Sequence, residues 1–286
     1  AAQVGGGLKP LLFLAGLAAP GATFYVTVSG LGGEAVYEQR FLSLAMEMDK
    51  LMRSTADAKV TTLTGENATK PNVRKALEEA SKTAVAGDTL IVTLIGHGSF
   101  DGVDYKVNIP GADVTAIELG EWMDKVPAQK QAVINTTSSS GGSIDALKRD
   151  NRVIVSATKA GSERLATQFP RFWVEALRNP EADADKNEQI SVLEAFRYAD
   201  RKVVDFYESQ KRLATEHAAL DDLGSTRDLS WIIAEAPAQT EGLPWPQRDP
   251  SEEITVVALV RWRRGQRTVQ RLGSAHPHGA WLRWES

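Results

Sequence analysis

The sequence predicts an α/β fold, a three-layer α/β/α sandwich with a mainly parallel sheet. Two observations lead to this class. Short, continuously apolar runs recur between residues 23 and 222, and amphipathic helical patterns separate them. Strands that are apolar along their whole length are buried on both faces, which is typical of a parallel sheet covered by helices. A chain of 286 residues is long enough to bury a large core of this kind.

Five segments have the composition expected of buried strands. They are short, rich in branched apolar residues, and followed by polar or small residues: 24–28, 60–63, 89–95, 131–135 and 153–157. The segments between them are long enough for helical crossovers, so we expect the strands to run parallel.

The intervening segments repeat apolar residues at helical spacing. In residues 34–53 such residues fall on one face, and the next helix is expected to begin near Thr69, with Pro71 in its opening turn. Further helices are expected at residues 114–123, 144–149, 169–178 and 191–213.

The start of the chain has the pattern of a secretory signal. Lys9 precedes an apolar run at residues 11–19, and small residues follow. The run is shorter than the about 20 residues that a membrane-spanning helix needs. We therefore expect residues 1–22 to be a signal-peptide-like segment of an exported protein, periplasmic or secreted, without a stable membrane span. A buried N-terminal strand or helix is the alternative.

The α/β domain is expected to cover residues 23–224, and the composition changes after it. Residues 225–286 are predicted to form a linker and a small, Trp- and Arg-rich C-terminal appendage with β structure. Its arginines either form the solvated face of a hairpin or contact an anionic surface. The net charge of the chain, −4, argues against a nucleic-acid-binding protein. No feature of the sequence indicates an oligomeric state.

Reactive side chains follow two of the predicted strands. His97 stands between two glycines after residues 89–95, and Ser138 follows residues 131–135, just before Ser140 and Gly141. Open α/β folds hold their sites at the carboxyl ends of parallel strands. Glycines beside His97 let the chain turn sharply and let a ligand approach closely. The sequence thus predicts a cleft in which His97 and Ser138 face each other.

These two motifs, taken with the order of elements over residues 23–222, resemble the legumain (asparaginyl endopeptidase) branch of the caspase–haemoglobinase peptidase superfamily. The resemblance implies a caspase–haemoglobinase-like fold, a peptide or protein segment bound in the cleft, and no required cofactor. It implies an acid/base role for His97, the nucleophile position for Ser138 and an oxyanion-binding amide at Gly98.

The resemblance also implies a substrate pocket. The residues at its positions are Glu38, Thr136, Thr158 and Ser162. Glu38 falls near the place of an arginine that the family uses to bind asparagine, so a preference for asparagine is not expected.

The family carries a cysteine where this chain has Ser138, and the chain contains no cysteine. A thiolate is a strong nucleophile near neutral pH, whereas a serine hydroxyl needs a base oriented by a third group. Only Asp101 and Asp104 follow His97 closely enough in sequence to be considered for that role. We expect a relative of secreted cysteine peptidases that is inactive at Ser138, by natural divergence or by an engineered change. A serine hydrolase using Ser138 and His97 and a non-catalytic peptide- or calcium-binding protein are the alternatives.

An acidic segment has the spacing of an EF-hand calcium loop. Oxygen ligands fall at its alternate positions, with a backbone carbonyl at position seven: Asp183, Asp185, Asn187, Gln189, Ser191 and Glu194. Glu188 stands where such loops carry glycine, which is expected to weaken binding. Calcium is therefore a possible ligand. The alternative is an acidic helix start in which Ser191 and Glu194 form a capping box.

A dinucleotide-binding motif is a further, weaker alternative. Residues 30–35 match G-x-G-x-x-A after a strand, but no acidic residue closes the second strand.

Overall fold

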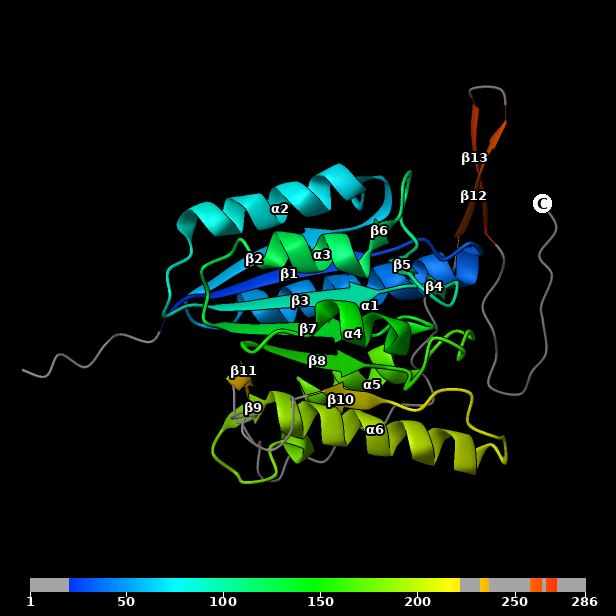
Figure 1. Cartoon of the computed structure of the whole chain (residues 1–286). Helices are drawn as coiled ribbons and strands as arrows, with labels where there is room; N and C mark the ends of the chain where they lie inside the picture. The colour runs from blue at the N-terminus through cyan, green and yellow to red at the C-terminus, as the bar shows by residue number, and fades with distance from the viewer. Residues whose placement is uncertain (1–20, 222–231, 237–257, 264–265, 272–286) are drawn as a thin grey trace, which may run out of the picture. The chain divides into compact units, whose positions relative to one another are not determined.

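The computed structural model describes residues 21–221, 232–236, 258–263 and 266–271. The chain divides into two compact units, Ala1–Ala238 and Gln239–Ser286. The first unit is an α/β sandwich with a mainly parallel central sheet, which confirms the predicted fold class (Figure 1). No helix in the described part of the chain is long and apolar enough to cross a membrane.

The central sheet has six strands in the order β10-β8-β7-β3-β1-β2. All five predicted strands are present and parallel, and a short antiparallel strand, β10, extends the β8 edge. Their bounds are β1 Thr23–Ser29, β2 Ala58–Leu63, β3 Thr89–Ile95, β7 Lys130–Asn135, β8 Arg152–Ser156 and β10 Ala219–Asp221.

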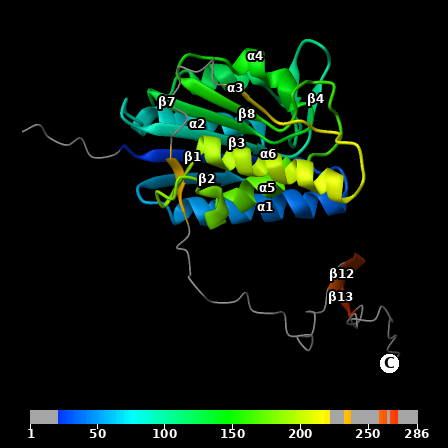
Figure 2. The same cartoon turned by 90° about the horizontal axis from the view of Figure 1, so that it is seen from below.

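Helices cover both faces of the sheet, as Figures 1 and 2 show from two directions. The apolar residues of α1, α5 and α6 belong to one buried cluster, and those of α2, α3 and α4 belong to the other. The bounds are α1 Ala35–Arg53, α2 Lys70–Thr83, α3 Ala116–Met123, α4 Ile144–Leu147, α5 Phe169–Ala176 and α6 Val192–Ser209, with 3₁₀ turns at η1 Gly65–Asn67, η2 Ser140–Ser143 and η3 Pro180–Ala182.

Local sequence explains where these helices begin. Pro71 lies in the first turn of α2, where its missing N–H has no intrahelical partner to lose. Thr115 and Glu118 form a capping box at the start of α3. The predicted helix 114–123 begins later than expected because Val114 and Thr115 pair with a neighbouring strand as β6.

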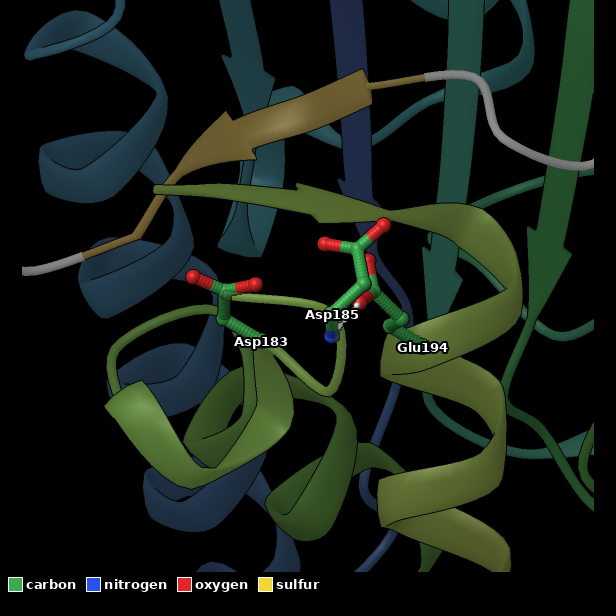
Figure 3. Close-up of side chains that lie close together, drawn as sticks. All are labelled: Asp183, Asp185 and Glu194. Atoms are coloured by element: carbon green, nitrogen blue, oxygen red, sulfur yellow. Dashed lines mark hydrogen bonds between the residues drawn. The ribbon is translucent and has the colours of Figure 1, made fainter. Parts of the chain in front are cut away.

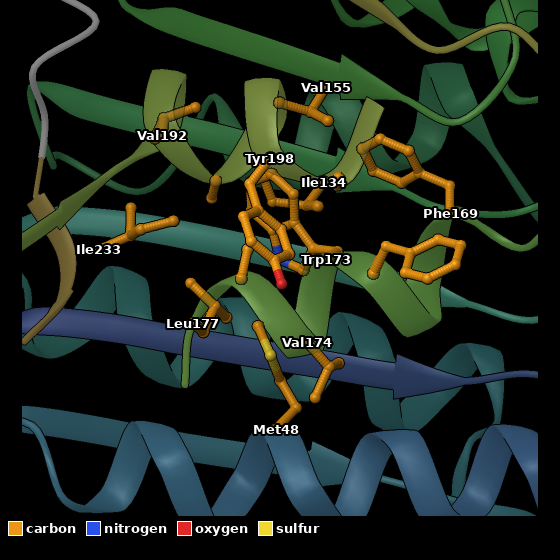
Figure 4. Close-up of a cluster of buried hydrophobic side chains, with 14 of the residues drawn as sticks. Met48, Ile134, Val155, Phe169, Trp173, Val174, Leu177, Val192, Tyr198 and Ile233 are labelled. Carbon is orange, nitrogen blue, oxygen red and sulfur yellow. The ribbon is translucent and has the colours of Figure 1, made fainter. Parts of the chain in front are cut away.

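The cluster between α5, α6 and the sheet is shown in Figure 4. Trp173 is 1% exposed and stacks on Phe169, with ring centroids 6.0 Å apart. Met48 from α1 and Tyr198 from α6 belong to the same cluster. Fully burying an aromatic side chain stabilises a fold by roughly 1.5–3 kcal/mol, so this cluster fixes both helices against the strands.

Two small sheets flank the main one. A three-stranded sheet follows β3 directly and consists of β4 Gly98–Phe100, β5 Tyr105–Val107 and β6 Val114–Thr115. On the opposite side of the unit, β9 Gln189–Ser191 pairs with β11 Ile232–Glu235, and the Tyr25 hydroxyl donates to the Ile233 carbonyl. β11 falls within residues 225–286, where the sequence predicts a linker and an appendage. It is a strand there because its backbone pairs with β9.

The second unit contains an antiparallel hairpin, β12 Ala258–Arg263 with β13 Gln266–Arg271. The signal-like residues 1–20 and most of the predicted linker and appendage lie outside the described residues.

Candidate functional site

Two of the predicted catalytic residues, Gly98 and Ser138, meet at the carboxyl ends of β3 and β7, which are neighbours in the sheet. Gly98 directly follows His97, shortly after the end of β3 at Ile95, and Ser138 follows the end of β7 at Asn135. The Ser138 hydroxyl oxygen lies 3.1 Å from both the backbone nitrogen and the carbonyl oxygen of Gly98. The sheet therefore brings Ser138 against the residue that follows His97.

These contacts use the two groups to which the resemblance assigns catalytic roles, the hydroxyl of Ser138 and the backbone N–H of Gly98. The Ser138 hydroxyl donates to the Gly98 carbonyl and accepts from the Gly98 N–H. Gly98 N–H is the amide expected to bind an oxyanion, and here its partner is the Ser138 oxygen. Ser138 is 2% exposed. In this state the hydroxyl is withheld from a substrate and the amide is withheld from an oxyanion.

The His97 side chain packs against two aromatic residues of α1. Its ring meets those of Tyr37 and Phe41 edge-on, each with a centroid distance of 5.1 Å. Burial lowers the pKa of His97 below its usual value, and a hydrogen bond with the Gly32 backbone opposes that shift. The imidazole is therefore neutral at neutral pH, as a proton acceptor must be.

The side chains considered as orienting acids do not reach His97. Asp101 accepts from the backbone N–H groups of Val103 and Asp104 and so closes its own turn. Among the described residues, no carboxylate is hydrogen-bonded to His97. Glu38 acts on His97 through its charge alone, and in the described part of the chain no hydrogen bond joins Ser138 to His97, so a Ser-His-acid arrangement is not formed here.

The titration of His97 can be checked directly. We expect the midpoint of its ring-proton signal in NMR to lie below 6.5, because the partly buried imidazole disfavours a charge. Since the folded pKa is lowered, the contribution of His97 to stability is present above 6.5 and is lost as the pH falls through the folded pKa. His97→Asn identifies the signal by removing it. A midpoint at or above 6.5 would contradict the burial argument.

Ser139, next to Ser138, carries two local penalties. Its backbone is left-handed, with φ 56° and ψ 13°, and its hydroxyl is buried without a hydrogen-bond partner. The Ser139 N–H donates to the Glu163 carbonyl at 2.8 Å, and the Gly142 N–H donates to the Ser139 carbonyl. Strained and unsatisfied residues cluster at functional sites, because elsewhere selection removes them.

We expect Ser139→Gly to stabilise the fold by about 1 kcal/mol. Glycine adopts φ above zero without cost and removes a buried hydroxyl, and these gains exceed its greater freedom in the unfolded chain. Chemical denaturation measures the change. Ser162→Gly, an exposed serine on the loop after β8 with an ordinary φ, is the control and should be neutral or slightly destabilising. A loss of stability in Ser139→Gly would show that the hydroxyl has a partner.

A network of buried hydroxyls and amides holds the loops beneath the site. Tyr105 contacts Asn135 and Thr137, and burial raises the pKa of Tyr105 to about 12. The Ser140 and Thr158 hydroxyls bond to each other, and Thr158 also accepts from the Gly141 N–H. The loops after β7 and β8 are thereby fixed to one another.

The residues predicted to line the substrate pocket differ in accessibility. Thr136 and Thr158 are fully buried, and the Thr136 hydroxyl donates to the Leu94 carbonyl. Glu38 is exposed and accepts from the Gly32 N–H, which closes the loop between β1 and α1. Ser162 is exposed on the loop after β8. Only Glu38 and Ser162 therefore present surface to a ligand in this state.

The structure also reveals anchors of the loop after β8 that the sequence did not indicate. The Glu163 carboxylate lies 2.5 Å from His217 Nδ1 and accepts from the His217 backbone N–H. Glu216 is 2% exposed and accepts from the N–H groups of Gln168 and Phe169 at the start of α5. The sequence offers one hint of these anchors: Glu216 and His217 stand side by side just before the short strand β10.

The acidic loop brings three of its carboxylates together. One oxygen from each of Asp183, Asp185 and Glu194 lies within 4.8 Å of the others. Figure 3 shows the three side chains. Asp183 accepts from the N–H groups of Asn187 and Glu188. Glu188 has φ 65°, so the turn that usually needs glycine is made in spite of its side chain.

The predicted capping box is present in the same segment. The Ser191 hydroxyl accepts from the Glu194 N–H, and the Glu194 carboxylate accepts from the Ser191 N–H. The other Glu194 oxygen accepts from Ala184. Burial raises the pKa of Glu194, but these hydrogen bonds outweigh it and the pKa lies below its usual value. Gln189 lies in β9, paired with β11.

Comparison with solved structures identifies the fold. The chain is similar to caspase-1 from Spodoptera frugiperda, with a TM-score of 0.51 and 13% sequence identity over 77% of this chain and 91% of that chain. The chain has a caspase-like fold.

Two further solved structures are similar to this chain. They are the Drosophila initiator caspase Dronc (13% identity, TM-score 0.49, 71% of this chain and 80% of that one) and protein GSU0716 from Geobacter sulfurreducens (13% identity, TM-score 0.47, 71% and 93%). A family model described as "Uncharacterized protein conserved in bacteria (DUF2332)" matches residues 202–284. Comparison with curated proteins gave no match.

Proposed function

We propose that this protein is peptidase-like and that it binds a peptide segment at the carboxyl ends of β3 and β7 without cleaving it. The observation that carries the proposal is the double hydrogen bond between the Ser138 hydroxyl and the Gly98 backbone. It replaces the contacts that a nucleophile and an oxyanion would need. The resemblance to legumain-type peptidases supports the choice of a peptide as ligand.

Binding without turnover is tested with a fluorescent peptide library. The wild-type protein should retain peptides and release them intact, as mass spectrometry of the recovered peptides would show. His97→Asn, at the half-buried ring between Tyr37 and Phe41, should weaken retention. A control change at an exposed residue that carries none of these contacts, Glu208→Ala in α6, should not. If no peptide is retained, or if all are cleaved, the proposal is wrong.

Export to the periplasm or beyond the cell is part of the proposal. Its support is the charge, apolar run and small residues of the first 22 positions, which lie outside the described residues apart from the last two. Fractionation of producing cells with N-terminal sequencing of the protein tests it. Protein recovered only from the cell interior with these residues intact would overturn it.

We also propose that the loop at residues 183–194 binds calcium. The support is the EF-hand spacing together with the convergence of Asp183, Asp185 and Glu194. Such a site would stabilise the start of α6 and has no catalytic part. Asn187, the Gln189 carbonyl and Ser191 would complete the ligand set.

We expect millimolar calcium to raise the thermal midpoint of the protein, and chelator to reverse the rise. Glu194→Gln should abolish the response, because it removes the carboxylate at position twelve of the loop. Glu188→Gly is the matched control. Glu188 already has φ 65°, so the glycine should stabilise the protein with and without calcium, by up to about 1 kcal/mol, and change the calcium response little. No response of the wild type would leave the segment as a capped helix start.

A further inference from the structure

Two glycines on neighbouring loops form a slot that holds the ring of Phe100. Gly142 follows β7 and Gly161 follows β8. A Cβ atom at Gly142 would lie 2.6 Å from Phe100 Cδ2, and one at Gly161 would lie 2.1 Å from Phe100 Cδ1. Nonbonded carbon atoms do not approach so closely, so each wall of the slot requires the absence of a side chain. Gly142 lies nearest the Cδ2 edge of the ring and Gly161 nearest its Cδ1 edge.

The walls of the slot are parts of the candidate site. Gly142 lies four residues after Ser138, and its N–H donates to the Ser139 carbonyl. Gly161 belongs to the loop whose Glu163 carbonyl accepts from the Ser139 N–H. Phe100 itself comes three residues after His97. A side chain in this slot is therefore next to the residues expected to meet a peptide.

Phe100 differs from the aromatic residues of the core. It is partly exposed and packs against the edge of one apolar cluster, whereas Phe169 is fully buried in the other. It is carried by β4, which pairs with β5 over three residues and is not a strand of the main sheet. Displacing the ring from the slot would leave the six-stranded sheet intact.

A second observation on the same wall points to a missing ligand. The Ser139 hydroxyl is buried and has no hydrogen-bond partner. A buried hydroxyl without a partner is uncommon, because it has lost water and gained nothing in return. A peptide backbone entering beside the slot would supply both donors and acceptors to this group.

We propose that the slot between Gly142 and Gly161 is a pocket for an aromatic side chain of a bound peptide, and that Phe100 occupies it as an internal ligand. The inference rests on the proposed peptide-binding function and names its specificity. Two bare backbone walls fit a flat ring and exclude branched aliphatic side chains, so the pocket distinguishes phenylalanine or tyrosine from leucine. Phe100 must leave before the peptide enters, which makes the free protein self-inhibited.

The test uses Phe100→Ala in the full chain, with N-acetyl-phenylalaninamide and N-acetyl-leucinamide as probes in NMR titrations. We expect the variant to bind the phenylalanine amide at least about tenfold more tightly than the wild type does, and more tightly than it binds the leucine amide. Adding Gly161→Ala should abolish the gain, since the new methyl group occupies the slot. Phe169→Ala is the matched control: its cavity is enclosed, so it should not admit an amide.

A folded Phe100→Ala that binds the phenylalanine amide no better than the wild type would overturn the proposal, as would equal binding by Phe169→Ala. If Phe100→Ala does not fold, Phe100→Leu is used with the same criteria, and absence of any gain there overturns the proposal. The slot and the proposed function fail separately. Intact peptides retained by a protein whose variants ignore the amide would refute the slot alone, whereas amide binding without peptide retention would refute the function alone.

Discussion

Ser138→Cys is expected to give the protein measurable peptidase activity, at least about 100-fold above the wild-type background. A thiol is larger than a hydroxyl and a weaker hydrogen-bonding group, so it cannot keep both bonds to Gly98. The Gly98 N–H then becomes available to an oxyanion. His97 is neutral because burial lowers its pKa, and it can accept the thiol proton.

Cleavage of short fluorogenic peptides measures this gain. Ser138→Ala is the control and should be as inactive as the wild type, and His97→Asn placed in the cysteine variant should remove the new activity. Two results would contradict the view that the protein is inactive only because Ser138 replaces a cysteine. No cleavage by a folded Ser138→Cys would mean that the cleft no longer supports catalysis. Turnover by the wild type that Ser138→Ala abolishes would establish a serine hydrolase.

Glu216→Ala is expected to destabilise the fold by about 3–5 kcal/mol, the largest single effect predicted for this chain. The carboxylate satisfies the N–H groups of Gln168 and Phe169 and accepts from the Tyr207 hydroxyl. Arg40 carries the nearby opposite charge. Removing the carboxylate leaves two buried N–H groups at the start of α5 unsatisfied. Chemical denaturation measures the loss, and Glu208→Ala on the exposed face of α6 should cost less than about 0.5 kcal/mol.

The pH dependence of stability distinguishes the effect of the Glu216 charge from the effect of the shape of its side chain. Burial raises the pKa of Glu216, against the opposing hydrogen bonds, so the folded protein holds its proton to a higher pH than the unfolded chain. Stability therefore falls as the pH rises from the ordinary value of 4.5 through the raised folded value. Glu216→Gln, which keeps the shape and cannot ionise, should lack this fall. An identical pH profile in both proteins would contradict the assignment.

The fold could be predicted because its elements are local. Strands β1, β3, β7 and β8 centre on apolar runs, and the start of α2 follows from Pro71 and that of α3 from a polar capping residue. That Ser138 lies against Gly98, the residue after His97, at one edge of the sheet follows from strand order alone. These features depend on periodicity and on the behaviour of parallel sheets, which a single sequence records.

The partners of the site residues could not be predicted, because they depend on contacts between loops. Nothing in the sequence indicates that the Ser138 hydroxyl bonds to Gly98 rather than to His97, or that Ser139 is left-handed. The seating of Phe100 between two glycines joins three loops that are distant in the chain. Strand β10 and the pairing of β9 with β11 were missed because short antiparallel strands carry little periodic signal.

The pairing of β9 with β11 has a consequence for how the protein is made. A ribosome that has released residues 183–194 has not yet synthesised Ile232–Glu235, the strand that completes their small sheet. The bond from the Tyr25 hydroxyl to the Ile233 carbonyl must likewise wait for a segment more than 200 residues later in the chain. A nascent chain can form the helix of α6 early, but the acidic loop is finished only after the rest of the α/β unit has been synthesised. Assembly of this corner is thus delayed until late in synthesis, and any nascent chain that stalls before residue 232 leaves the edge of β9 open to other strands.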